Sequence, residues 1–143
     1  MPFGKDRSSF NDTLKQKFIK FCDEIHNKNI FFTNSDFREY KEVEMCASDF
    51  VYCDPPYFNS TAAYNENGGW TAKDEYDLYN FLNCLSQKKI RWALSNDLAV
   101  NTLACAFAKE MGYNIHYLDA NYGNCNYHKK DRSKGKEVLI TNY

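Results

Sequence analysis

The chain has 143 residues, a length that suits one domain with its own hydrophobic core. Its hydrophobic content of 43% argues against disorder, and its formal net charge of −1 excludes a global positive field for nucleic acid. The sequence contains neither a signal-peptide core nor an apolar run of roughly 18 residues. We therefore expect a cytoplasmic protein with no membrane partner.

Six cysteines are spread along the sequence, at positions 22, 46, 53, 84, 105 and 125. No two of them form a Cys-x-x-Cys pair, and no histidine lies at zinc-finger spacing from a cysteine pair. Because buried cysteine behaves as a small hydrophobic residue, the pattern predicts free thiols in a reducing compartment and no metal site.

Local patterns predict the helices and strands in chain order. Apolar residues at helical spacing predict helices from residue 11 or 12 to about 27, from 71 or 74 to about 88, and over 98–111. Asn96 or Asp97 is the expected cap of the third helix, and Gly112 is expected to end it. Runs of β-favouring residues predict strands at 30–33, 50–52, 90–94, 113–118 and 137–143.

The stretch at residues 49–57, Asp-Phe-Val-Tyr-Cys-Asp-Pro-Pro-Tyr, organises the rest of the chain. Its apolar run predicts a buried strand, which two prolines end because neither can donate to a β ladder. Asp54, the Pro55 carbonyl and the Tyr57 ring then lie at the end of a strand, where ligands bind in open α/β sheets. The arrangement suits a planar molecule with an amino group. Asp54 and the Pro55 carbonyl would accept hydrogen bonds from the amino group, and Tyr57 would stack on the planar ring.

Asp54-Pro55-Pro56-Tyr57 after an apolar strand resembles the catalytic motif of the amino-group nucleic-acid methyltransferases, which use S-adenosylmethionine. The longer stretch 49–57 resembles the Dam-like, D12-class adenine-N6 DNA methyltransferases. Flanking segments match as well, namely Pro2-Phe3-Gly4-Lys5, Leu94-Ser95-Asn96 and the closing Glu-x-Leu-Ile-Thr-Asn-Tyr at 137–143. The resemblance covers essentially the whole chain, residues 1–143, as the C-terminal catalytic portion of a single methyltransferase domain.

The resemblance implies a catalytic role for the motif Asp54, Pro55, Pro56 and Tyr57. The target adenine is extruded from duplex DNA because its N6 is unreachable in the base stack. Tyr57 would stack on the extruded base, while Asp54 and the Pro55 carbonyl would take hydrogen bonds from the N6 amine. The aspartate form of the motif favours adenine N6 over cytosine N4.

The resemblance also implies a cofactor pocket for S-adenosylmethionine, lined by Asp36, Phe37 and Asp54. An equally weighted alternative for the first two is a helix cap, Ser35 or Asp36, followed by a core phenylalanine. Residues 58–70 are polar and contain glycine, so we expect a mobile loop above the site. Trp70 is either a lid aromatic or an anchor for the end of this loop, and the anchor is favoured.

Basic residues on two segments are implied to contact DNA phosphates. They are Lys5, Lys129, Lys130 and Arg132. The alternative is a solvated N-terminus and a solvated loop, which is the default for such a charge run.

Parts of the family pattern are missing from the sequence. No glycine-rich strand-to-helix turn occurs, and the paired glycines Gly68-Gly69 follow the catalytic motif. The expected fold class is therefore α/β, a partial Rossmann-like S-adenosylmethionine-dependent methyltransferase fold without its first two strands, glycine-rich loop and target-recognition domain. Strands 30–33 and 49–54 would each present an unsatisfied edge. Either a second polypeptide or another copy pairs with these edges, or the sheet changes its register, and intermolecular pairing is favoured.

These observations support two hypotheses on function. The first is a DNA adenine-N6 methyltransferase that acts on double-stranded DNA with S-adenosylmethionine, either as this chain alone or as the catalytic half of an enzyme that needs a missing N-terminal half. The second is a truncated, catalytically inactive remnant that keeps nucleic-acid or partner binding.

Overall fold

A computed structural model describes residues 11–42, 45–58, 69–118 and 136–143. The chain divides into two compact units, Met1–Ser35 and Asp36–Tyr143, which we describe separately. In the described ranges no helix is long and apolar enough to cross a membrane. The five cysteines within these ranges are free.

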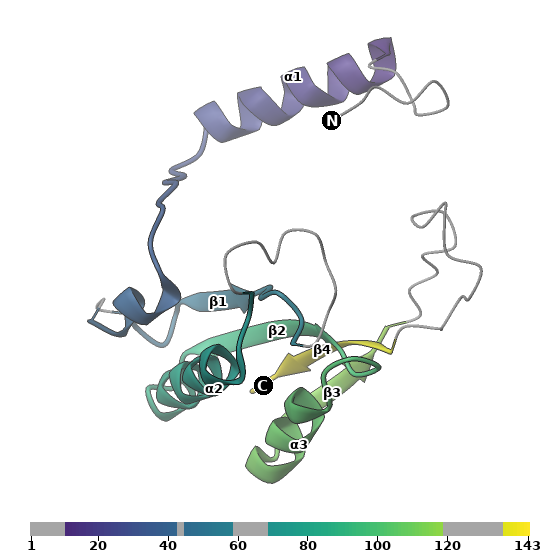
Figure 1. The fold of residues 1–143 in the computed structure, drawn as a ribbon. Helices are drawn as coiled ribbons and strands as arrows, with labels where there is room; N and C mark the ends of the chain where they lie inside the picture. The colour runs from purple at the N-terminus through teal and green to yellow at the C-terminus, as the bar shows by residue number, and fades with distance from the viewer. Residues whose placement is uncertain (1–10, 43–44, 59–68, 119–135) are drawn as a thin grey trace, which may run out of the picture. The chain divides into compact units, whose positions relative to one another are not determined.

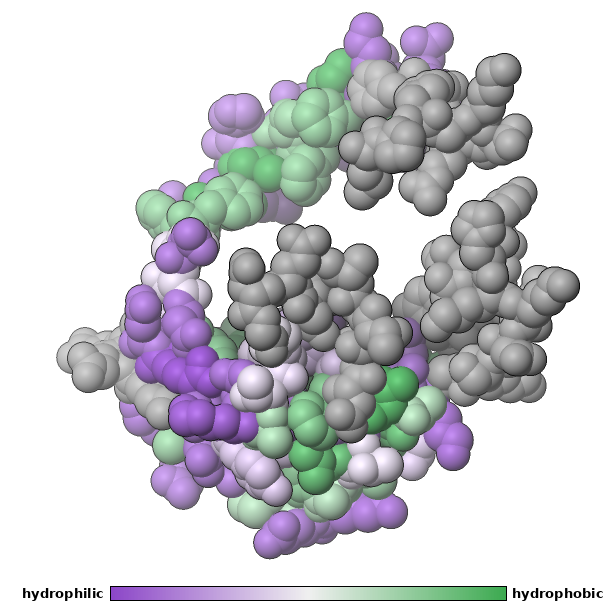
Figure 2. Space-filling model, viewed as in Figure 1, coloured by the Kyte–Doolittle hydropathy of each residue, from purple (hydrophilic) through white to green (hydrophobic). Residues whose placement is uncertain are grey.

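The described part of the first unit, residues 11–35, contains one helix, α1 (Asp12–His26), as predicted (Figure 1). Asn11 caps it, because its side chain accepts a hydrogen bond of 2.9 Å from the Leu14 amide. No residue of α1 is buried, and its apolar side chains lie along the helix in contact with solvent (Figure 2). The predicted apolar face is therefore present, but it covers no core.

The predicted strand at 30–33 is wrong, because these residues form no regular structure. Phe31 and Phe32 are 85% and 81% exposed. β-favouring residues form a strand only when a neighbouring strand takes up their backbone hydrogen bonds. No strand in the described part of the chain pairs with this segment.

The second unit is a mixed α/β layer with one four-stranded sheet (Figure 1). The strands are β1 (Phe50–Cys53), β2 (Arg91–Asp97), β3 (Asn114–Tyr117) and β4 (Glu137–Thr141), in the spatial order β1-β2-β4-β3. β1 is parallel to β2, whereas β4 is antiparallel to both β2 and β3. The helices α2 (Ala72–Gln87) and α3 (Thr102–Met111) follow β1 and β2, and a 3-10 helix, η1 (Phe37–Glu42), opens the unit.

The core lies between the sheet and the two helices. Trp92 and Leu94 point from alternate positions of β2 to the same face, where Leu82 of α2 and Phe107 of α3 are also buried. Together with their neighbours they form one buried cluster: Leu78, Tyr79, Phe81, Leu82, Leu85, Ile90, Trp92, Leu94, Ala104, Phe107, Ala108, Val138 and Ile140. Both helices therefore cover the same face of the sheet.

β1 is a strand, as predicted, but it is not buried on both faces. It lies at the edge of the sheet, with Val51 and Cys53 packed against the core. Phe50 and Tyr52 point to the opposite face and are 51% and 57% exposed. The motif thus starts from an edge strand whose second face is open.

Pairing with β4 shifts the start of the third helix. β4 pairs with β2 as far as Asp97, so the polar residues after Leu94 belong to the strand and not to a cap. α3 begins only at Thr102, and Asn101 caps it. The predicted caps Asn96 and Asp97 are therefore wrong. Gly112 ends the helix as predicted, with a φ of 71°, which favours glycine.

Candidate functional site at the carboxyl edge of the sheet

Asp54 follows the last residue of β1 and lies at the carboxyl edge of the sheet. β1 and β2 are parallel and Cys53 pairs with Leu94, so the carboxyl ends of both strands meet at this edge. The Asp54 carboxylate is exposed, while Pro55, Pro56 and Tyr57 are partly buried. The structure thus places the four motif residues at the end of a strand, as the sequence predicts.

Ser95 of β2 holds the Asp54 carboxylate. Its hydroxyl donates a hydrogen bond of 2.7 Å to Asp54 Oδ1 and lies 3.3 Å from the carbonyl oxygen of Cys53. Sequence reasoning did not assign a role to Ser95, although it noted the Leu-Ser-Asn segment at the end of the neighbouring strand. The place of this segment at the end of the strand next to β1 was the signal that could have indicated a contact between Ser95 and Asp54.

Two further side chains lie at this edge, the thiol of Cys53 and the amide of Asn96. Burial raises the pKa of the Cys53 thiol to about 11, so the residue before Asp54 stays neutral at physiological pH. Asn96 is 1% exposed, and its side-chain oxygen accepts a hydrogen bond of 2.9 Å from the Asp97 amide. Its Nδ2 has no partner within the described ranges.

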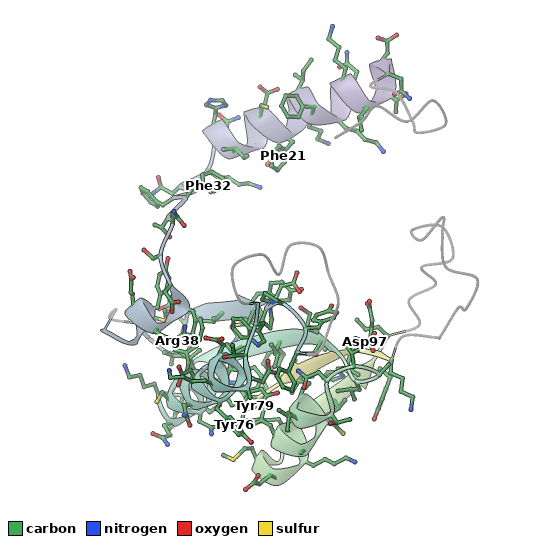
Figure 3. The ribbon with its side chains drawn as sticks, in the orientation of Figure 1. Phe21, Phe32, Arg38, Tyr76, Tyr79 and Asp97 are labelled. Atoms are coloured by element: carbon green, nitrogen blue, oxygen red, sulfur yellow. The ribbon has the colours of Figure 1, made fainter. Side chains whose placement is uncertain are left out.

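Asp36 belongs to a cluster of charges around one arginine. Arg38 donates from its backbone amide and from its guanidinium to Asp36, at 2.9 to 3.2 Å. The same guanidinium, from the Arg38 labelled in Figure 3, donates to two carboxylates of α2. These are Asp77, at 2.8 Å, and Asp74. Asp36 thus caps the start of η1, which confirms the capping alternative. A role in cofactor binding stays a prediction.

Three members of this cluster, Arg38, Asp74 and Asp77, have pKa values shifted toward the charged form. Hydrogen bonds lower the pKa of Asp74 to about 2, with those from Thr71 contributing most and the one from Arg38 less. Hydrogen bonds from Lys73 and then Arg38 lower the pKa of Asp77. The pKa of Arg38 is raised, above all by its hydrogen bond to Asp77. Arg38, Asp74 and Asp77 therefore stay ionised over the physiological range.

Phe37 and Trp70 pack at the N-terminal end of α2. The Phe37 ring lies 6.0 Å from the Trp70 ring and 6.1 Å from the Phe81 ring, between centroids. The core-phenylalanine alternative is therefore confirmed for Phe37. The indole N–H of Trp70 donates to the carboxylate of Glu75, so the anchor interpretation of Trp70 is also confirmed.

Glu75 is the fully buried centre of a second polar network. Besides the bond from Trp70, its carboxylate accepts hydrogen bonds from the hydroxyl of Tyr79 and, at 2.6 Å, from Asn101 Nδ2. Burial and the nearby carboxylate raise the pKa of Tyr79, which therefore stays a donor. The network joins the segment before α2, α2 itself and the start of α3, and sequence reasoning missed it.

Connectivity brings these residues to the same edge as Asp54. The chain leaves β1 at this edge and returns through α2 to the opposite edge, where β2 starts at Arg91. The N-terminal end of α2, with Trp70 and Asp74, therefore lies at the carboxyl edge. An apolar hollow of about 140 Å³, bordered by Leu85, Lys88 and Ile90, lies instead near the amino ends of the strands.

Several predicted site residues lie outside the described residues. They are Lys5, Lys129, Lys130 and Arg132, together with most of the predicted loop at 58–70. Among the residues that the structure does describe, no three His, Cys, Asp or Glu side chains form a metal-binding group.

Comparison with known proteins identifies the family. Residues 1–130 match the family described as D12 class N6 adenine-specific DNA methyltransferase. The chain is 39% identical to the type II methyltransferase M.FokI of Planomicrobium okeanokoites and 35% identical to the modification methylase StsI of Streptococcus sanguinis. Each alignment covers 99% of this chain and 23% of the relative.

The chain aligns to a larger share of a third relative. The type II methyltransferase M1.LlaDCHI of Lactococcus lactis subsp. cremoris is 30% identical over all of this chain and 49% of that protein. The chain thus spans between about a quarter and a half of the curated relatives it matches. With the Asp54-Pro55-Pro56-Tyr57 motif at the end of a strand in a mixed α/β unit, the chain belongs to the D12 class of N6 adenine-specific DNA methyltransferases.

Proposed function

We propose that this chain carries the catalytic motif of a DNA adenine-N6 methyltransferase that transfers a methyl group from S-adenosylmethionine to adenine in double-stranded DNA. The observation that carries the proposal is the Asp54 carboxylate, exposed at the end of β1 and held there by Ser95. Family membership supports the reaction class, and the two relatives are named as a type II methyltransferase and a modification methylase.

In the proposed mechanism the adenine is first extruded from the duplex, because the N6 atom is shielded in the stack. Tyr57 stacks on the extruded base. Asp54 and the Pro55 carbonyl accept hydrogen bonds from the N6 amine and draw its lone pair toward the methyl donor. Positioning and electrostatics supply most of the rate, and no covalent enzyme intermediate forms.

The residues of this chain fit one end of the cofactor, which supplies an electrophilic methyl group when bound. Asp36 offers a carboxylate that is 49% exposed even with its bonds to Arg38, and Phe37 offers an aromatic ring beside it. Asp54 would lie near the methyl group. The glycine-rich turn that allows close backbone approach is absent from the sequence, so the rest of the pocket needs another source.

We propose that intermolecular pairing completes the sheet and the pocket, with a second polypeptide or with another copy. Two observations support this step. β1 lies at the edge of the four-stranded sheet, and Phe31 and Phe32, which are exposed, belong to no strand in the described part of the chain. We expect Lys5, Lys129, Lys130 and Arg132 to contact DNA phosphates in the completed protein, which would act on DNA in the cytoplasm.

The second candidate function is a catalytically inactive remnant that binds nucleic acid or a partner. The missing glycine-rich turn favours it for the chain on its own. Calorimetric titration of the purified chain with S-adenosylmethionine or its demethylated product tests whether the chain alone has a cofactor pocket. Binding in the micromolar range would indicate a completed pocket and would contradict the inactive remnant, whereas no binding would indicate half an enzyme, whose other half must then be sought.

The test of Asp54 is a pair of matched carboxylate substitutions in β1 and its flanks. Asp54→Ala should lower methyl transfer from labelled cofactor by more than about 100-fold, because it removes the acceptor for the N6 amine. Asp49→Ala is the control, since Asp49 lies just before the other end of β1 and its carboxylate accepts a hydrogen bond from the Cys46 amide. If Asp54→Ala still methylates DNA at the parent rate, the assignment is wrong.

A further inference from the structure

The contact between Ser95 and Asp54 distinguishes the two oxygens of the carboxylate. Oδ1 accepts the hydrogen bond of 2.7 Å from Ser95. Oδ2 accepts no hydrogen bond from any residue that the structure describes. Both oxygens of an ionised carboxylate can accept hydrogen bonds. Oδ1 is therefore used within the protein, whereas Oδ2 can accept a hydrogen bond from a ligand.

Ser95 is well suited to fix the direction of another side chain. It lies in β2, the strand between β1 and β4, and its own backbone pairs with Leu139 of β4, one residue beyond the last β1 pair, Cys53 with Leu94. A side chain on a strand that is paired on both sides moves less than one on a loop. Asp54, in contrast, lies just beyond the end of an edge strand, and the prolines that follow it donate no backbone hydrogen bond.

A second acceptor, the Cys53 carbonyl oxygen, also lies close to the Ser95 hydroxyl. The hydroxyl lies 3.3 Å from the Cys53 carbonyl oxygen, the residue directly before Asp54. Its single proton favours the shorter bond to the charged carboxylate. The serine thus contacts both the backbone at the end of β1 and the carboxylate that follows it.

We propose that Ser95 is a positioning residue that holds Asp54 Oδ1 and so presents Oδ2 to the amino group of the target base. This inference rests on the proposed function, because it assumes that Asp54 accepts from that amine. It adds a residue from a second strand to the motif and assigns separate roles to the two carboxylate oxygens.

A merely structural role would tie the end of β1 to β2 without affecting how the carboxylate points. Three-bond couplings from the Asp54 side-chain carboxyl carbon to its backbone nitrogen and carbonyl report the rotamer directly. In the labelled full chain we expect one rotamer for the parent and for Ser95→Thr, which keeps the hydroxyl. We expect averaged couplings for Ser95→Ala, with the other sheet resonances unchanged.

Ser48→Ala is the matched control, because Ser48 is an exposed serine just before β1 whose hydroxyl contacts the Cys46 sulfur. It should leave the Asp54 couplings unchanged. A single Asp54 rotamer in Ser95→Ala would overturn the inference, whether or not the chain has activity by itself.

Kinetics then separate this inference from the proposed function. Ser95→Ala should lower kcat by about 10-fold to 100-fold with unchanged KM for DNA, and Ser95→Thr should restore most of it. If Asp54→Ala inactivates the protein but Ser95→Ala keeps the parent kcat, the positioning role of Ser95 is contradicted and the proposed function is not. Full activity in Asp54→Ala contradicts the proposed function itself, whatever the couplings show.

Discussion

The two units of the chain carry similar apolar patterns but use them differently. In α2 of the second unit the apolar stripe is buried, with Leu82 fully inaccessible. In α1 of the first unit the corresponding stripe contains Phe18 and Phe21, which are 57% and 59% exposed. The periodicity is local and is satisfied in both helices, whereas burial needs a second surface. An amphipathic pattern therefore predicts a helix and not its partner.

The largest effect should come from the buried carboxylate of the second unit. Glu75→Leu keeps the side-chain volume close to the original but leaves the donors of Trp70, Tyr79 and Asn101 without an acceptor. We expect the free energy of unfolding to fall by about 4 kcal/mol, because several buried donors lose their partner at once. Urea denaturation of the purified chain measures this.

The control for that change is Glu110→Ala, a glutamate on the exposed side of α3. It should change the free energy of unfolding by less than about 0.5 kcal/mol. Equal effects of the two substitutions would show that the Glu75 network does not stabilise the second unit.

The next effect compares the two helices directly. Leu82→Ala should destabilise the chain by about 3 kcal/mol, because it removes buried methyl groups and leaves a cavity in the core. Phe21→Ala removes a larger side chain from α1 but should change the free energy of unfolding by less than about 0.5 kcal/mol. A loss of more than about 2 kcal/mol in Phe21→Ala would mean that α1 is buried in solution.

Where the sequence predicted structure well, the determining contacts are local. The helices at 12–26 and 72–87 and the stop at Gly112 follow from periodicity and caps within a few residues. The predicted cap of α3, Asn96 or Asp97, differs from the observed cap, Asn101, because pairing with β4, about 40 residues later, keeps Asn96 and Asp97 in β2. The segment 30–33 failed for the same reason, since a strand depends on a partner elsewhere.

The candidate site shows the same division. The motif at Asp54 is contiguous, so its residues and its place at a strand end could be read from the sequence. Its supports could not, because Ser95 lies 41 positions away and acts across two strands. The bonds from Arg38 to Asp74 and Asp77 likewise join residues 36 and 39 positions apart. Charge pairs at such separations leave no periodic signal.

The smallest effect concerns the cap of α2 and its dependence on pH. Thr71 and Asp74 form a capping box, and Thr71 is the largest cause of the low pKa of Asp74. Because the pKa of about 2 lies below the ordinary value of 3.8, the ionised carboxylate stabilises the folded state. This contribution is fully present above pH values near 3.8 and is lost as the pH falls toward 2.

Thr71→Ala should therefore lower the free energy of unfolding by about 1 kcal/mol at pH 7, and the difference from the parent should shrink as the pH falls from 4 to 2. Thr102→Ala, at the exposed first position of α3, is the matched control and should show neither effect. Urea denaturation at pH 7, 4 and 2 measures both variants. A difference that stays constant over this range would mean that Thr71 acts through its own cap bond and not through the charge of Asp74. Such a result would separate the cap from the Arg38 cluster, which would then hold Asp74 without help from the start of the helix.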